Sequence, residues 1–295
     1  MGDYMGHTAI PSLEGESSAI PLVRERKRTC QFSYQRDLPM ILAVRNAMFI
    51  SYSQLYEQLR AQGSETNRQG FAWRLNRLVE LGVIRKLTQA FPYRGPTYAI
   101  TRNGLSCLEA CGEGLISLTS DSRSLPNESQ AAHFLELGEI RSALRGRGLL
   151  EKWISDVELK SLNLVLDSPL AKDYDAVADL NLGVSGRLSV GLEYERSIKT
   201  AARYGEIVGE IKEEKQIDML LFLTASQDLV YQLKGILGDM EFPIGVIPSR
   251  VFCKDPLGVK MHNTLTETTK LSLLEMSSML DQGTTDRKLA RPTQV

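Results

Sequence analysis

Apolar residues recur with a helical period in three consecutive segments near the start of the chain and then alternate in two short ones. Ser51 or Ser53 can cap the second helix, and Thr66 with Gln69 forms a capping-box pattern at the start of the third. Trp73 fits either the core or a dimer contact, and we expect it in the core. The predicted elements are helices over 38–48, 51–63 and 66–82 and strands over 83–88 and 97–100.

The second half of the chain combines helices with strands of two kinds. Segment 217–224 is almost wholly apolar, which is typical of a strand buried on both faces in a parallel sheet. Two earlier segments alternate apolar and polar residues, which predicts half-buried strands joined by a turn over 183–186. The predicted order is a helix over 131–144, strands over 152–161, 174–182 and 187–195, a helix over 198–214, a strand over 217–224, a helix over 229–237 and a strand over 244–251.

Changes in composition predict an α+β chain of several segments. A stretch rich in Gly, Ser and Asp separates two units that each have enough apolar residues for a core. The predicted segments are a mobile N-terminal arm (1–37), a first folded unit (38–111), a linker (112–129), a second folded unit (130–255) and a partly helical C-terminal tail (256–295).

Charge is distributed unevenly along the chain, although its net charge is only −1. Residues 24–102 contain fourteen Lys and Arg against five Asp and Glu, whereas residues 113–295 contain 21 basic and 27 acidic residues. The basic segment 24–102 therefore favours a polyanionic partner for the first half of the chain. The alternative is that its charges only keep the surface soluble. The four cysteines lack the spacing of a disulfide framework, and no apolar run reaches the ~20 residues that span a bilayer. We therefore expect a cytoplasmic protein without membrane insertion.

The first unit resembles the winged-helix families in its stretch LVELGVIRKL…PTYAIT and in the order of its predicted elements. The resemblance covers about residues 38–111 and implies that the third helix enters the major groove of double-stranded DNA while the hairpin tip reaches the backbone or minor groove. Cations are needed on that helix and at that tip. The candidates are Arg68, Arg74, Arg77 and Arg94. Which of them contact bases stays open, and solvated surface arginines are the alternative.

Carboxylates follow the two alternating strands of the second unit. If Asp175 pairs with Glu193 or with Glu195, all three lie on one face, and Lys199 follows at the start of the next helix. Grouped carboxylates repel one another unless a cation lies among them, and Mg²⁺ or Mn²⁺ prefers such oxygen ligands. A lysine beside the metal can stabilise charge on a phosphate. The alternative is a solvated polar face on an edge hairpin.

The predicted order α-β-β-β-α-β resembles the restriction-endonuclease-like nucleases over about residues 130–252. Those nucleases carry an acidic residue on the second core strand and a Glu and a Lys two residues apart on the third. In this chain Glu195 stands at the position of that lysine. Lys199 lies four residues further on, and its long side chain could reach back to the same place. Asp179, on the face of Asp175, is a rival ligand, and Glu139 is a weaker one.

The two units together resemble the MOB-C class of plasmid relaxases and the broader replication-relaxation family. That resemblance implies metal-dependent, site- and strand-specific DNA nicking at an origin of transfer, with an accessory mobilisation protein and a coupling protein as partners. Most relaxases instead use clustered histidines with a nucleophilic tyrosine. The three histidines of this chain, His7, His133 and His262, are scattered, which argues against that chemistry.

Two other functions remain open at this stage. One is a non-catalytic DNA-binding regulator of plasmid replication or transcription, in which a decayed nuclease fold serves as a homodimerisation body. The other is a host-defence or mobile-element endonuclease that makes double-strand breaks.

Overall fold

The computed structural model describes most of the chain from Ser33 onward. Residues 1–32 of the expected N-terminal arm and the loop 88–94, which contains Arg94, lie outside the described residues. The described ranges are 33–87, 95–121, 125, 127–167, 169–183, 186–238, 240–266 and 269–289.

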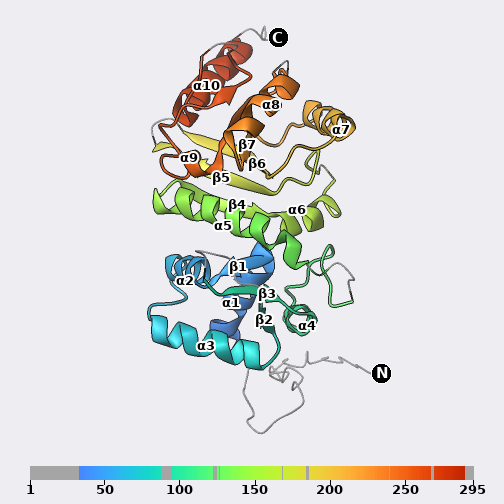
Figure 1. Cartoon of the computed structure of the whole chain (residues 1–295), viewed down its shortest axis with the longest axis vertical. Coiled ribbons are helices and arrows are strands. Elements are labelled where there is room, and N and C mark those ends of the chain that lie inside the picture. Colours follow the sequence, from blue (N-terminus) through green and yellow to red (C-terminus); the bar gives the residue numbers. More distant parts are fainter. Residues whose placement is uncertain are drawn as a thin grey trace, which may run out of the picture. The chain divides into compact units, whose positions relative to one another are not determined.

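Four helices and a small antiparallel sheet form what we call the N-terminal module, residues 34–110 (Figure 1). Its three strands lie in the order β1-β3-β2, with both pairs antiparallel. Strand β1 is only three residues long and was not predicted. The elements are α1 (Tyr34–Ala47), β1 (Phe49–Ser51), α2 (Tyr52–Ala61), α3 (Arg68–Glu80), β2 (Ile84–Lys86), β3 (Thr97–Ile100) and α4 (Arg102–Ala110).

Two helix starts in this module show how side chains satisfy free backbone N–H groups. Ser51 caps α2, as one of the two predicted candidates: its Oγ accepts from Gln54 N at 3.3 Å, and Gln54 Oε1 accepts from Ser51 N at 3.0 Å. The predicted capping box of α3 is wrong. Asn67 caps this helix through Oδ1, which accepts from Gln69 N at 2.7 Å, so the cap lies one residue later than predicted and the helix begins at Arg68.

A mixed six-stranded sheet forms the centre of what we call the sheet module, residues 128–289. The strand order is β4-β5-β6-β7-β8-β9; β6, β7 and β8 run parallel, and the other pairs are antiparallel. The predicted antiparallel hairpin and the buried parallel strand are thereby confirmed. The elements are η1 (Glu128–Gln130), α5 (Ala131–Gly146), β4 (Leu150–Ser155), α6 (Asp156–Asn163), β5 (Ala176–Asn181), β6 (Arg187–Glu195), α7 (Ala201–Lys212), β7 (Met219–Thr224), α8 (Gln227–Leu237), β8 (Ile244–Pro248), α9 (Ser249–Phe252), β9 (His262–Asn263) and α10 (Leu273–Leu289).

Two predicted strands are too long. The strand expected over 152–161 ends at Ser155, whose backbone N and Oγ both donate to Glu158 Oε2, at 2.9 and 2.6 Å, and α6 begins there. Such an exchange at a helix start opposes continued strand geometry. The strand expected over 244–251 ends at Pro248, after which α9 follows.

Both faces of the six-stranded sheet are covered by helices. Helices α5, α9 and α10 pack on one face, through residues such as Ile140, Phe252 and Met276. Helices α7 and α8 pack on the other, through residues such as Ile207 and Val230. Since β7 lies between the two apolar layers, its side chains are buried on both faces, as its sequence predicts.

Helix α5 also packs against the N-terminal module (Figure 1). Gln54 Nε2 donates to the Leu135 carbonyl at 2.8 Å, and Gly138 leaves room for that contact because a Cβ there would lie 2.7 Å from the same nitrogen. From Ser33 onward the chain accordingly forms one compact unit. Within the described ranges, no helix has the length and apolar character needed to cross a membrane.

Candidate active site

The central strand β6 carries two buried carboxylates. Glu193 and Glu195 are separated by one residue, so both side chains point to the face that α7 covers, where both are buried. An ionised carboxylate loses its hydration when it is buried, at a cost of several kcal/mol, on the order of the desolvation penalty of a single ion. A cation beside the carboxylate offsets this cost. The neighbours of these two glutamates therefore decide what the site can do.

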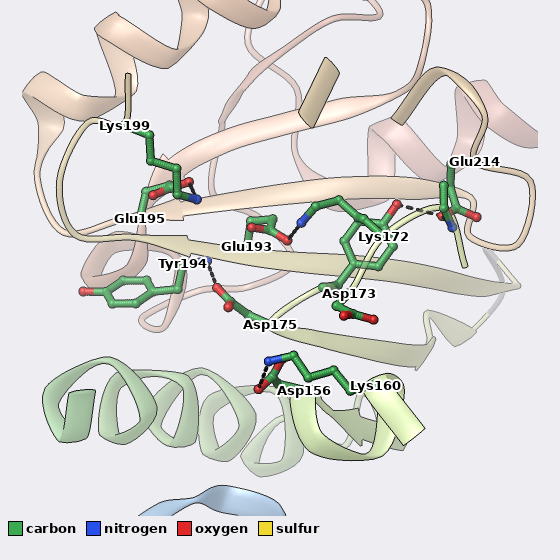
Figure 2. Close-up of polar contacts among 12 residues, drawn as sticks. Asp156, Lys160, Lys172, Asp173, Asp175, Glu193, Tyr194, Glu195, Lys199 and Glu214 are labelled. Atoms are coloured by element: carbon green, nitrogen blue, oxygen red, sulfur yellow. Dashed lines mark hydrogen bonds and ion pairs between the residues drawn. The ribbon is translucent and has the colours of Figure 1, made fainter. Parts of the chain in front are cut away.

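Lys172 provides the cation for Glu193. It lies in the loop before β5, contacts the Glu193 carboxylate through Nζ, and sits 4.8 Å from the centre of the Tyr174 ring (Figure 2). Burial raises the pKa of Glu193 to about 7, with Lys172 opposing that shift and Asp175 adding to it. Lys172 was not predicted as a site residue.

Lys199 provides the cation for Glu195. It contacts Glu195 Oε1 through Nζ, and its side chain is 37% exposed, whereas that of Glu195 is 4% exposed. Lys199 precedes α7 rather than lying in it, because Thr200 caps this helix. Partial burial would lower the pKa of Lys199, but the hydrogen bond and charge of Glu195 outweigh burial and raise it. The ammonium group of Lys199 is thus open to solvent while it contacts the buried carboxylate of Glu195.

Asp175 lies beside the two glutamates but turns toward α5. The register pairs Ala176 with Leu192, which sets Asp175 opposite Glu193. Its Oδ2 accepts from Tyr194 N at 2.7 Å (Figure 2). Its Oδ1 lies 3.2 Å from His133 Nε2 on α5. The three carboxylates therefore do not share one face, contrary to the prediction. At the end of β5 the Asp175 carboxylate, rather than a backbone carbonyl, accepts the hydrogen bond from the Tyr194 N–H, and this turns it away from Glu193.

His133 is a part of this site that the sequence did not indicate. Burial would lower its pKa, but the hydrogen bond to Asp175, together with the charges of Asp175, Glu193 and Asp156, outweighs burial and raises it. Asp156 pairs with Lys160 at 2.8 Å (Figure 2). Each acid of the site thus has a basic partner.

The two rival ligands lie apart from this cluster. Asp179 Oδ1 accepts from Ser189 Oγ at 3.0 Å, further along the hairpin. Glu139 lies near Cys253, whose pKa is raised to about 11 by burial and by this charge. Among the described residues, no three His, Cys, Asp or Glu side chains are already arranged to hold a metal ion.

The predicted DNA-contacting arginines of α3 have different surroundings. Arg68 is exposed and lies 5.1 Å over the Tyr56 ring. Arg74 forms an ion pair with buried Glu65, and Arg77 forms one with buried Asp37; each arginine side chain is 12% exposed. Both arginines therefore border the apolar face of α3 and pair with acidic residues of the core.

The exposed stripe of α3 consists of other residues. Trp73 is 65% exposed, so the prediction that it belongs to the core is wrong. Arg77 lies 5.3 Å over its ring on one side. Residues at helical spacing along the same exposed surface are Gln69, Trp73, Asn76 and Glu80.

Comparison with known proteins adds one weak similarity. No protein-family model matches the chain, and no curated protein is significantly similar to it. Among solved structures, restriction endonuclease FokI bound to DNA matches at 10% identity and a TM-score of 0.24, over 85% of this chain and 45% of that one. The chain thus spans less than half the length of that structure. A TM-score this low does not establish a common fold.

Proposed function

We propose that the chain binds double-stranded DNA through the N-terminal module, with α3 in the major groove as in a winged helix. The excess of basic residues over 24–102 and the exposed polar stripe of α3 support this proposal. Gln69 and Asn76 are side chains that can read base edges, and Arg68 is free to meet phosphate. In this proposal Arg74 and Arg77 hold α3 in place through Glu65 and Asp37.

We propose further that the sheet module cleaves one DNA strand with the help of Mg²⁺ or Mn²⁺. The observation that carries this proposal is the pair of buried glutamates on β6, each facing a lysine. Carboxylate oxygens are suitable ligands for these hard cations, so Glu193 and Glu195 would hold the metal. Asp175, which faces His133 instead, would have to turn toward them to complete the set of three ligands. When bound, such an ion polarises a phosphate and activates water.

The protein's own side chains have separate tasks in this proposal. Lys199 is exposed enough to meet a DNA phosphate, where its ammonium group would stabilise charge that develops during cleavage. Lys172 neutralises Glu193 while no other cation is near. His133 orients Asp175. The finer proposal is a plasmid mobilisation relaxase that nicks at an origin of transfer, with the accessory and coupling proteins that this class implies.

A second candidate function is a non-catalytic DNA-binding regulator. It is favoured by the ion pairs themselves, since Lys172 and Lys199 already satisfy both glutamates, and the described side chains contain no preformed three-ligand group. In that case the lysines are permanent structural partners, and a divalent cation has no affinity for the site.

Supercoiled plasmid separates the two functions. Plasmid carrying the DNA that flanks the coding sequence of this chain is incubated with Mg²⁺, with Mn²⁺ or with chelator, and open circles and linear products are quantified. We expect metal-dependent open circles, lost in the double variant Glu193→Gln, Glu195→Gln and retained in Glu151→Gln, an acidic control on β4 that pairs with Arg187. Linear product instead indicates a double-strand endonuclease, and no product with intact DNA binding supports the regulator.

A further inference from the structure

A cavity of about 470 Å³ lies where α5 and β4 meet α2 and β1. Its volume is in the range of small-molecule sites, roughly 300–1,000 Å³. Aromatic side chains and guanidinium groups both line it. They are Phe49, Phe134, Trp153, Arg60, Arg141 and Arg145.

Two of these arginines, Arg141 and Arg145, lie one turn apart on α5 and have no ion pair with a carboxylate of the described chain. Arg141 Nη1 donates to Gln58 Oε1 at 2.9 Å, and its guanidinium lies 5.6 Å from the Trp153 ring, but its Nε is buried without an acceptor. Burial, and then the charge of Arg145, lowers the pKa of Arg141 to about 10, and the charge of Glu158 opposes this shift only in part. Burial likewise lowers the pKa of Arg145.

This arrangement is unfavourable without a counter-charge. Like charges one helical turn apart repel each other, and half-buried cations such as these two, without a carboxylate partner, lose part of their hydration. The acids that line the cavity do not supply the counter-charge: Asp156 pairs with Lys160 and Asp175 with His133, while Glu57 is exposed. An anion in the cavity would offset both the repulsion and the lost hydration.

We propose that this cavity binds a nucleoside phosphate, with the phosphate on Arg141 and Arg145 and the base among the aromatic side chains. Guanidinium groups match phosphate oxygens with paired N–H donors, and the faces of Phe134 and Trp153 suit a planar ring. The ligand would contact both modules at once, because Gln58 and Arg60 belong to α2 and the two arginines to α5. A free nucleotide and a nucleotide of a DNA strand share this chemistry, and the experiment distinguishes them. Binding here does not depend on strand cleavage.

Fluorescence of Trp153 reports on the cavity once Trp73, the other of the two tryptophans, is replaced by phenylalanine. The probes are ribonucleoside mono- and triphosphates, the corresponding nucleosides, inorganic phosphate and a short single-stranded DNA. We expect saturable quenching by nucleoside phosphates and binding about tenfold weaker in Arg141→Gln and in Arg145→Gln, the loss expected for one charged hydrogen bond. Arg250→Gln, an exposed arginine on α9, is the matched control and should bind unchanged.

A second variant keeps the test valid if the glutamine variants fold poorly. Arg145→Met keeps the length of the side chain and loses no ion pair, so the melting temperature without ligand should stay the same or rise, while the rise on adding nucleotide disappears. A marked fall without ligand would assign Arg145 a structural role. Quenching by the DNA strand alone, lost in the same variants, assigns the site to DNA. No response to any phosphate-bearing probe, or variants that bind as the wild type does, overturns the proposal.

Discussion

The ammonium group of Lys172 and the carboxylate of Glu193 form an ion pair from which solvent is almost excluded, with 7% and 6% of the two side chains exposed. The two residues come from different segments, the loop before β5 and the strand β6. In a buried pair each charge compensates the other, so the loss of one partner is far more costly than the loss of both. This relationship makes the site sensitive to single substitutions.

Replacing Lys172 alone should therefore destabilise the protein strongly. We expect Lys172→Met to lower the free energy of unfolding by about 3–5 kcal/mol near pH 8, where Glu193 is ionised, because it leaves a buried carboxylate without a partner. The double variant Lys172→Met, Glu193→Gln should recover most of that loss. Denaturant unfolding of the two single variants and the double variant gives the coupling directly. Losses that simply add would show that the two charges do not interact.

The raised pKa of Glu193 predicts a pH dependence of stability. Burial raises this pKa to about 7, against about 4.3 in an unfolded chain. Between these values the folded protein holds a proton that the unfolded chain has released. The stability that Glu193 confers is therefore greatest below that window and falls as the pH rises through about 7. Unfolding free energies of wild type and Glu193→Gln should converge or cross over this range, whereas Glu151→Gln should follow the wild type. Parallel curves for Glu193→Gln would mean that its pKa is ordinary.

Elements with a strong local pattern could be predicted from the sequence. The alternation over 187–195 gave β6 with its observed bounds, because every second side chain of this strand faces an apolar layer. Strand β1 has only three residues, all buried, and so carries no period. The end of β4 does have a signal in the sequence, since Ser155 followed by Glu158 is a capping box. The alternation of apolar residues continues past Ser155, however, and led to the prediction of a longer strand.

The site was predicted less completely because its contacts join distant segments. Glu193, Glu195 and Lys199 lie close in the sequence and were found as a motif. Lys172 lies 21 residues from Glu193, and His133 reaches Asp175 from the helix α5, so neither has a local pattern. A buried acid needs a partner, and this rule could have prompted a search for a lysine near the hairpin. The same rule explains Arg74, whose partner Glu65 is buried.

The two sets of α3 residues should respond differently to substitution. Gln69 and Asn76 lie on the exposed stripe of α3. Replacing either with alanine should leave the stability of the fold unchanged and reduce the free-energy difference between cognate and scrambled DNA by about 1–3 kcal/mol. Arg74→Ala should instead destabilise the fold by about 3 kcal/mol, because it leaves Glu65 buried without its partner. Competition binding to cognate and scrambled duplexes, beside thermal unfolding, measures both effects. Arg68→Ala is the electrostatic control and should reduce the salt dependence of binding by about one counterion. Discrimination lost in Arg74→Ala at full stability would reverse the assignment.

Lys199 should contribute to the rate of strand cleavage more than to metal binding. Its exposed ammonium group can stabilise charge that develops on the phosphate only in the transition state. We expect Lys199→Ala to slow nicking by about 100-fold, the loss typical of one such stabilising group, while the affinity for Mn²⁺ measured by calorimetry changes little. Lys199→Arg should recover only part of the rate, because a guanidinium keeps the charge but has a planar, bulkier geometry. Lys212→Ala, at the other end of α7, should nick as the wild type does. If Glu193→Gln also nicks at the wild-type rate, cleavage does not occur at this site, and the regulator becomes the better account of the chain.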